Sequence, residues 1–331
     1  MTKEPRRRPQ RSRLGLVLML AALCYGAWWL SPFSGGGVTV TGLAFEAKPY
    51  VMFGLVPSFT REGQPLRSSN ALGYRGAELQ QPKPEGRTRV VCLGGSTTYG
   101  FRVADSEAWP AVLGRLLSAA RPELDIEVVN AGVESYTSAE SLARLAFDVL
   151  ELKPDLLVLH HAANDVRPRR YPGFEPGYGH FRKVWNGSPE GYAPTGGELS
   201  GINFFIQQAP DPAADAAEPG DVLSRLERAG TGSFRRNLIS MLGVAAAHDV
   251  PLVLTTMPYD PASIGSDPGL GPGIDQHNDV LRALAAERDV PLVDLATLFG
   301  GGGFVDPIHL DPKGSRRKAR LLVEPLAALL P

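Results

Sequence analysis

Short apolar runs alternate with helical stretches along the chain from residue 89 onward. The apolar runs predict buried strands at 89–94, 126–130, 155–161, 251–257 and 291–295. Apolar residues spaced three and four positions apart predict helices at about 107–120, 138–151, 232–248, 273–288 and 312–329. Strands that are apolar throughout and separated by helices are typical of a parallel sheet with both faces covered. We therefore expect one doubly wound α/β/α domain with a five-stranded parallel sheet over residues 88–331.

Two segments interrupt this alternation. Residues 38–87 hold short apolar runs and a turn-rich stretch, which predict a small β-rich or irregular lead-in packed on the main domain. Residues 166–231 form a long insertion after the third predicted strand. Its first part is rich in glycine, proline and aromatic residues, whereas 208–221 carries four acidic residues and no basic one. The acidic part is predicted to be a mobile loop.

The N-terminal thirty residues have a different pattern. Residues 1–13 carry six basic residues and one acidic residue, and residues 14–30 carry no charge and include a tryptophan pair near their end. An apolar segment of this length is near the short end for a spanning helix, and tryptophan suits the membrane interface. We expect a signal anchor with a cytoplasmic head, a linker at 31–37 and a catalytic domain on the periplasmic side of a bacterial inner membrane. A cleaved signal peptide is the alternative, but no clear small-x-small cleavage site follows the apolar run.

Composition excludes several classes of protein. With 43% hydrophobic and 21% charged residues, the chain can bury a large core, so general disorder is excluded. The net charge is −1, and because the head is strongly basic, the remainder is mildly acidic, which argues against a nucleic-acid groove. Cys24 lies in the apolar segment and Cys92 in the first strand, so no disulfide is expected.

Residues with useful chemistry follow the predicted strands, at the edge where a parallel sheet binds its ligands. Ser96 follows the first strand within "GGSTTYG", Gly132 follows the second and Asn164 follows the third. Asp306 and His309 precede the last helix. A serine with a histidine and a carboxylate can act as nucleophile, base and orienting group, and amide N–H groups can bind an oxyanion. Ser96 alone could be an ordinary turn residue, but the complete set favours catalysis.

The ordered set resembles the SGNH/GDSL hydrolase family over roughly residues 88–330. The first block of that family, glycine-aspartate-serine, is matched by Gly94, Gly95 and Ser96, with Gly95 in place of the aspartate. The glycine of the second block is matched by Gly132.

The third and fourth blocks of the family are matched further along the chain. Residues 162–165 match glycine-x-asparagine-aspartate, with Ala162 in place of the glycine. Asp306 through His309 match aspartate-x-x-histidine without departure. One block alone is a weak signal, whereas four blocks in order at strand ends are a strong one.

The resemblance implies a flavodoxin-like α/β/α fold and a serine esterase that works through an acyl-serine intermediate. Its catalytic residues would be Ser96, Asp306 and His309. The N–H groups of Ser96 and Gly132 and the side-chain amide of Asn164 would form the oxyanion hole. No cofactor and no metal are expected.

Other residues are candidates for substrate or metal binding. The aromatic part of the insertion supplies Tyr171 and Trp185 as candidates for the substrate-binding wall. His160 and His161 are adjacent in a strand and so point to opposite faces, which argues against a shared metal ion. Asp165 is expected to be structural and to hold the loop that carries Asn164.

The expected function is that of a membrane-anchored extracytoplasmic serine esterase that removes acetyl or another short acyl group from a glycan or lipid. An O-acyltransferase with the same acyl-serine is an alternative that only the pocket lining would separate. A non-catalytic carbohydrate-binding relic is disfavoured by the intact Ser96, Asn164, Asp306 and His309. A nucleotide-binding protein is disfavoured because "GGSTTYG" lacks the lysine and spacing of a phosphate loop.

Overall fold

The centre of the molecule is a five-stranded parallel sheet. The computed structural model describes residues 44–48, 50–61, 67–182, 199–200 and 219–331. The strand order is β10-β9-β7-β5-β6, and all neighbouring strands pair in parallel. The strands are β5 (Arg87–Gly94), β6 (Asp125–Gly132), β7 (Leu156–His160), β9 (Leu252–Thr255) and β10 (Leu292–Val293). The predicted α/β fold and five-stranded parallel sheet are confirmed.

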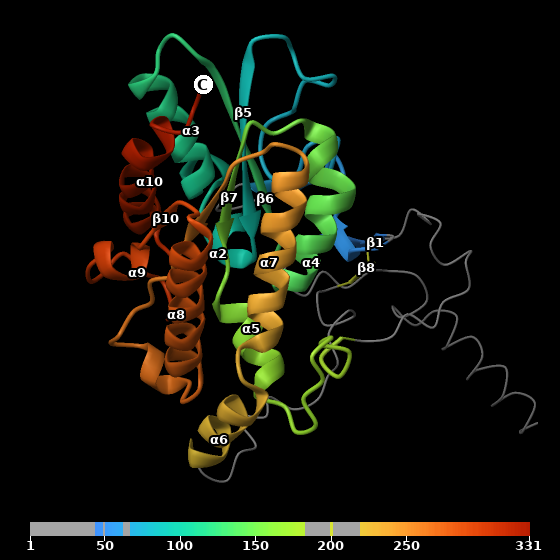
Figure 1. Ribbon diagram of the computed structural model, residues 1–331. Helices are drawn as coiled ribbons and strands as arrows, with labels where there is room; N and C mark the ends of the chain where they lie inside the picture. The colour runs from blue at the N-terminus through green and yellow to red at the C-terminus, as the bar shows by residue number, and fades with distance from the viewer. Residues whose placement is uncertain (1–43, 49, 62–66, 183–198, 201–218) are drawn as a thin grey trace, which may run out of the picture.

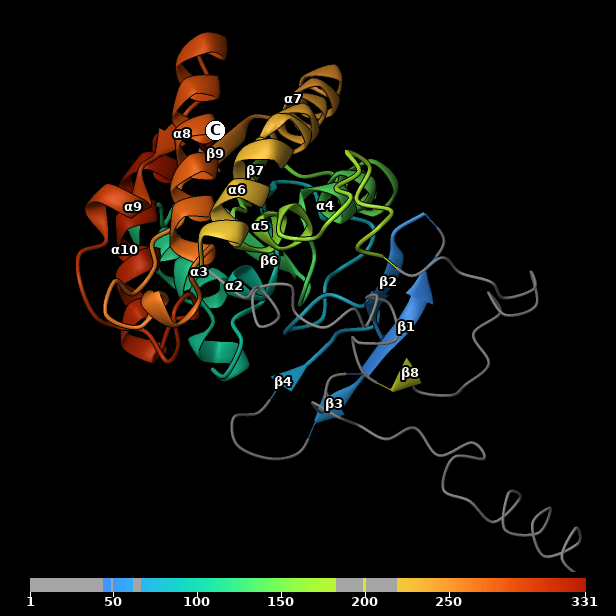
Figure 2. The same ribbon diagram turned by 90° about the horizontal axis from the view of Figure 1, so that it is seen from below.

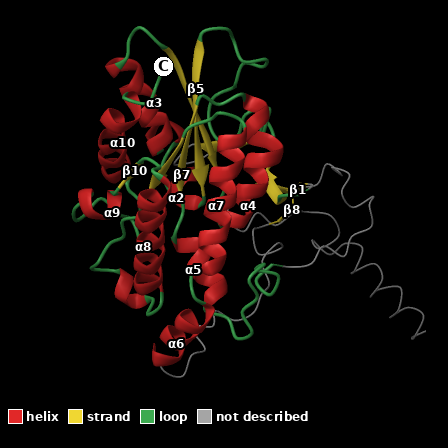
Figure 3. Cartoon of the chain, in the orientation of Figure 1, coloured by secondary structure: helices red, strands yellow, loops and turns green. Residues whose placement is uncertain are grey.

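Helices cover both faces of this sheet, as Figures 1 and 3 show. Helices α3 (Trp109–Ala120) and α10 (Pro312–Ala327) pack on the face that carries Val90 and Cys92. The opposite face carries Val91 and Leu93 and is covered by α4 (Ser138–Arg144), α7 (Gly232–Ala247) and α8 (Leu270–Arg288). Because successive strand residues point to opposite faces, the apolar runs seen in the sequence supply both core layers.

Several short helices were not predicted. They are α2 (Ser96–Tyr99), α5 (Ala163–Arg169), α6 (Pro219–Ala229) and α9 (Leu295–Leu298), with 3-10 turns η1 (Asp105–Glu107) and η6 (Ile264–Ser266). The helix expected over 138–151 changes type along its length: α4 ends at Arg144, and η2 (Leu145–Val149) and η3 (Leu150–Leu152) continue it as π- and 3-10 turns. Hydrophobic spacing does not distinguish these turns from a regular helix.

A second, antiparallel sheet lies beside the main domain, as Figure 2 shows. In the lead-in, β1 (Ala44–Lys48) and β2 (Met52–Leu55) form a hairpin, and β8 (Leu199–Ser200) of the insertion pairs with β1. The lead-in also contains β3 (Thr60–Arg61) and β4 (Arg67–Ser68). Residues 208–218 of the expected acidic loop lie outside the described residues, and residues 219–221 begin helix α6.

The hairpin packs directly on the chain segments that follow β5 and β6. Phe45 and Phe53 are fully buried in one cluster with Tyr99, Val133 and Tyr136. This cluster joins the lead-in to the loops at the carboxyl ends of the central strands, where ligand sites of such sheets lie.

The lead-in residue Arg75 holds the end of helix α2. Its guanidinium donates hydrogen bonds to the carbonyl oxygens of Tyr99, Gly100 and Val103 and forms a 2.7 Å ion pair with Asp105. Arg75 is 4% exposed, so these carbonyl groups obtain their partner in the protein interior.

The expected N-terminal anchor, residues 14–30, lies outside the described residues. Within the described ranges, no helix combines the length and the apolar character needed to cross a membrane.

Candidate active site

Ser96 is the first residue of helix α2, one residue after the turn that ends β5. Gly95 precedes it as the N-cap residue, and Ser96 is 8% exposed. The chain is closely packed at this turn. A Cβ on Gly94 would lie 2.1 Å from Thr98 Oγ1 and 2.6 Å from the carbonyl oxygen of His160. A glycine at this position therefore lets the strand turn sharply and present the serine at the sheet edge.

His309 brings its imidazole to Ser96 from the far end of the chain. His309 Nε2 lies 2.7 Å from Ser96 Oγ. The other ring nitrogen, Nδ1, lies 2.8 Å from Asp306 Oδ2. The ring also contacts Phe101, with 4.9 Å between the ring centroids. The predicted serine, histidine and aspartate therefore form one continuous hydrogen-bonded chain.

Asp306 is oriented by its own loop. Its Oδ1 accepts hydrogen bonds from the backbone N–H groups of Ile308 and His309, at 3.1 and 2.9 Å. Partial burial raises the pKa of this carboxyl, but the hydrogen bonds and charge of His309 outweigh burial, so the pKa lies below its usual value. Asp306 is therefore ionised near neutral pH and holds His309 Nδ1 in the protonated form that leaves Nε2 free to accept a proton.

Asn164 lies at the start of helix α5 and lines the same cleft as Ser96. Its Nδ2 donates a 2.9 Å hydrogen bond to the carbonyl oxygen of Tyr136. The next residue, Asp165, is fully buried and accepts hydrogen bonds from the backbone N–H and the hydroxyl of Ser138 and from the Tyr178 hydroxyl. Asp165 thus anchors helix α5, as predicted.

The structure contradicts the expected oxyanion role of Gly132. Its backbone N–H donates to Asn130 Oδ1 at 3.0 Å, and Gly132 is buried rather than part of the cleft lining. A Cβ at this position would lie 2.2 Å from the backbone nitrogen of Tyr99. Gly132 is therefore a packing residue that lets β6 approach helix α2 closely.

Ser135, three residues further on, reaches the cleft instead. It has a φ of 62°, and its carbonyl oxygen accepts a 2.8 Å hydrogen bond from Arg182. Within the described part of the chain, the Ser135 N–H donates no backbone hydrogen bond. No pattern of residues indicates this position, because a positive φ is uncommon for serine.

The cleft around Ser96 has a volume of about 320 Å³. Several lining residues were not predicted from the sequence, and they combine apolar with charged side chains: Phe101, Glu134, Arg167, Arg170, Asp267, Leu270 and Ile308. Arg170 forms a 3.0 Å ion pair with Asp267 across this wall. These residues come from loops and helix ends, where hydrophobic periodicity carries no information about which side chain faces a ligand.

Tyr171 and Trp185 are the two residues predicted to form the substrate-binding wall. Tyr171 is not among the described residues that line the cleft; its ring packs in an aromatic cluster, 5.7 Å from Phe181 and 6.0 Å from His180. Trp185 lies outside the described residues. The role of Tyr171 in substrate binding therefore stays a prediction.

The remaining strand-end histidines are buried and engaged. His160 Nδ1 lies 2.9 Å from Thr255 Oγ1, and His161 Nε2 lies 2.7 Å from Ser141 Oγ. Burial lowers the pKa of both groups, that of His161 to about 4. His277 is fully buried in helix α8. Within the described part of the chain, no cluster of histidine, cysteine and carboxylate residues could hold a metal ion.

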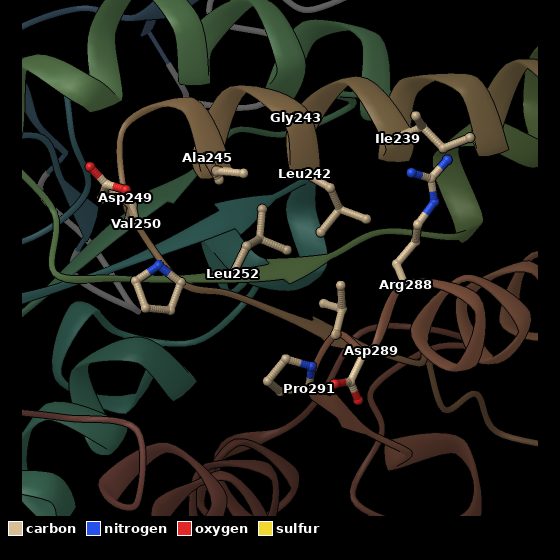
Figure 4. Close-up of a pocket in the computed structure, with 13 residues that line it drawn as sticks. Ile239, Leu242, Gly243, Ala245, Asp249, Val250, Leu252, Arg288, Asp289 and Pro291 are labelled. Atoms are coloured by element: carbon tan, nitrogen blue, oxygen red, sulfur yellow. The ribbon is translucent and has the colours of Figure 1, made fainter.

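A larger cavity, of about 650 Å³, lies at the opposite edge of the sheet, between the ends of α7 and α8. Figure 4 shows Leu242 and Leu252 pointing into it, with Arg288 at one side. The described residues that line this cavity include no serine, threonine, cysteine or histidine. The smaller cleft at Ser96 is therefore the site with reactive groups.

Comparison with known proteins agrees with this site. The model of the GDSL-like lipase/acylhydrolase family matches residues 92–317, which include Ser96, Asn164, Asp306 and His309. No curated protein matches the chain.

Solved structures with related folds include three bacterial proteins. A lipase/acylhydrolase from Enterococcus faecalis is 20% identical, with a TM-score of 0.48, and the match covers 74% of this chain and 97% of that one. A carbohydrate acetylesterase family member from Sinorhizobium meliloti is 16% identical, with a TM-score of 0.47 and coverage of 73% and 98%. A catalytic mutant of an acetylxylan esterase from Geobacillus stearothermophilus is 19% identical, with a TM-score of 0.47 and coverage of 72% and 94%.

Proposed function

Because the chain belongs to the GDSL-like lipase/acylhydrolase family, we propose that Ser96 is the nucleophile of its ester hydrolysis. The chain is a serine hydrolase that acts on esters. The observation that carries the assignment of Ser96 is the 2.7 Å contact between its Oγ and His309 Nε2, in a cleft open to substrate. In this reaction Ser96 Oγ attacks the ester carbonyl, the alcohol leaves, and water then releases the acid from the acyl-serine.

His309 acts as the general base and then as the general acid. It takes the proton of Ser96 Oγ during attack and gives it to the departing alcohol, and the same exchange with water follows in the second half of the reaction. Asp306 remains ionised and stabilises the imidazolium that forms in each half. The support for this assignment is the 2.8 Å contact between Asp306 Oδ2 and His309 Nδ1.

The oxyanion hole consists of the N–H groups of Ser96 and Ser135 together with the side-chain amide of Asn164. Ser135 takes the role first assigned to Gly132, because Ser135 lines the cleft whereas the Gly132 N–H is bound to Asn130. Donors that are already aimed at the developing charge need no reorganisation during the reaction. Removing one such donor costs about 3 to 4 kcal/mol of transition-state stabilisation.

The substrate is an acyl ester, with acetyl or another short acyl group, of a glycan rather than a lipid. The support is the composition of the cleft, where Glu134, Arg167, Arg170 and Asp267 place charged groups around Ser96. Such a lining suits the hydroxyl groups of a sugar better than a long hydrocarbon chain, because covering charged side chains with hydrocarbon costs free energy of desolvation.

The enzyme acts outside the cytoplasm, held by residues 14–30 in the inner membrane of a bacterium. This part of the proposal rests on the sequence alone, on the basic residues 1–13 followed by an uncharged apolar segment.

The test uses the full-length chain in detergent and a panel of acetylated and longer-chain acylated glycans and lipids. We expect acid to be released from acetylated glycans, and one serine-directed phosphonate to label each molecule. The Ser96→Ala variant should show neither property. Acid release by Ser96→Ala at the wild-type rate would reject the assignment of the nucleophile, and a preference for long-chain lipid esters would reject the glycan.

A further inference from the structure

The amide of Asn164 is confined on one side by the backbone of Gly95. A Cβ on Gly95 would lie 2.6 Å from Asn164 Nδ2 and 3.0 Å from the carbonyl oxygen of Tyr136. The φ and ψ of Gly95 are −88° and −151°, an extended conformation that other residues also adopt. The backbone therefore does not require glycine here, whereas the neighbouring amide does.

The carbonyl oxygen of Tyr136 is a second neighbour that confines the same amide. It accepts the 2.9 Å hydrogen bond from Asn164 Nδ2. A side-chain amide has two N–H groups in one plane, so binding one of them fixes the direction of the second. The direction of the N–H that would meet an oxyanion is therefore set by where the Tyr136 peptide lies.

The lead-in hairpin holds Tyr136 in its place. The Tyr136 hydroxyl donates a hydrogen bond to the carbonyl oxygen of Phe53, and the two rings meet edge to face with 5.0 Å between their centroids. Tyr136 is 1% exposed and shares its buried cluster with Phe45 and Tyr99. Both ends of this residue are therefore anchored, its side chain in the hairpin and its carbonyl oxygen on Asn164.

We propose that Gly95 and Tyr136 are positioning residues that together aim the Asn164 amide into the oxyanion hole. The proposal rests on the proposed function, in which Asn164 is an oxyanion donor. Gly95 stands where the family motif has an aspartate. In this chain, the Asn164 amide lies in the space that a side chain at residue 95 would enter. The hairpin, which precedes the part of the chain matched by the family model, thereby takes part in the geometry of the active site.

The experiment measures kcat and KM on an activated acetyl ester for Gly95→Ala and Tyr136→Phe, each alone and combined with Asn164→Ala. Gly95→Ala places a methyl group against the amide, and Tyr136→Phe removes only the hydroxyl anchor. Each single variant should lower kcat about 10-fold and change KM less than about twofold, because the amide acts on the transition state. In the Asn164→Ala background, neither substitution should lower kcat further, because the group they position is gone.

Two control variants add a methyl group or remove a tyrosine hydroxyl at positions away from Asn164. Gly114→Ala adds a methyl group in helix α3, 3.3 Å from Val128 Cβ, and Tyr259→Phe removes a hydroxyl that donates to Asp275 at 3.0 Å. Both should keep the wild-type kcat.

Two results would overturn the proposal: an unchanged kcat in Gly95→Ala and Tyr136→Phe, or equal losses with and without Asn164. If one variant does not fold, the other still decides the outcome. Ser96→Ala in the same assay tests the proposed function separately, since its full activity would reject the nucleophile while leaving the Asn164 coupling measurable.

Discussion

His309 Nε2 lies 2.7 Å from Ser96 Oγ, although 213 positions separate the two residues in the chain. The contact joins the turn after β5 to the loop before α10, and Asp306 supports it from the same loop. Parallel strands bring such distant loops together because their carboxyl ends share one edge of the sheet.

The three residues of this chain should act as a unit. Ser96→Ala and His309→Ala should each lower kcat by several orders of magnitude, and the double variant should be no worse than the worse single one. Asp306→Asn should cost less than His309→Ala, because a histidine held by the backbone can still accept a proton part of the time. Steady-state kinetics on an activated ester would check this, and additive losses would contradict a common mechanism.

Asn164 should contribute to kcat rather than to substrate binding. Asn164→Ala should lower kcat by about 10²- to 10³-fold with little change in KM, because its amide meets charge that develops only in the transition state. Asn237→Ala offers a control, since this buried asparagine donates to Ser138 Oγ and lies outside the cleft lining. An Asn164→Ala enzyme with normal kcat and raised KM would place Asn164 in ground-state binding instead.

Asp165 should make the stability of the fold depend on pH. Burial raises the pKa of this carboxyl from 3.8 to about 7, despite its hydrogen bonds from Ser138 and Tyr178. The folded protein therefore holds a proton that the unfolded chain loses at lower pH, so this contribution is fully present below about pH 4. It is lost as the pH rises from about 4 to about 7, and above that range it is constant.

Urea unfolding of wild type and Asp165→Asn between pH 4 and 8 would measure this contribution. Relative to Asp165→Asn, the wild type should lose unfolding free energy as the pH rises to about 7, by an amount on the order of a few kcal/mol. Above that pH, the difference between the two proteins should stay constant. A difference that stays flat over the whole range would show that Asp165 has an ordinary pKa.

Arg75 should be important for stability. Arg75→Ala should cost about 3 to 5 kcal/mol, because it removes the buried ion-pair partner of Asp105 and a hydrogen-bond donor to the carbonyl groups of Tyr99, Gly100 and Val103. The surface pair of Arg235 and Glu287, with side chains 41% and 49% exposed, provides the comparison, and Arg235→Ala should cost about 0 to 1 kcal/mol. Similar midpoints of denaturant unfolding for the two variants would contradict the role assigned to Arg75.

The membrane topology can be tested with reporter fusions. A reporter active only in the periplasm should work when fused after Pro331 and fail when fused after Arg13, because basic residues flanking an apolar segment stay in the cytoplasm. The reverse pattern of activity would overturn the signal anchor.

Much of the fold and the main catalytic groups could be predicted from the sequence. The apolar runs that became β5, β6, β7, β9 and β10 indicated a parallel sheet, because only strands buried on both faces are apolar throughout. That topology places the carboxyl ends of the strands at one edge, so the sequence alone predicts that Ser96, Asn164, Asp306 and His309 lie together.

Which backbone groups face the substrate cannot be predicted from the sequence and follows from the three-dimensional fold. Gly132 ends β6 and Ser135 lies three residues further on, but the Gly132 N–H is bound to Asn130 whereas Ser135 lines the cleft. The direction of an N–H depends on φ and ψ and on nearby acceptors, and neither leaves a hydrophobic pattern in the sequence.

The same limit applies to the parts that join distant segments. Neither the hydrogen bond from Tyr136 to Phe53 nor the clamp of Arg75 on helix α2 follows from residue spacing, because each links two segments through one specific side chain. The sheet, its ligand-binding edge and the reactive groups at that edge follow from the residue pattern, since periodic burial and strand direction are local and repeated properties. The orientation of those reactive groups depends on close packing, and close packing depends on all the neighbouring residues together.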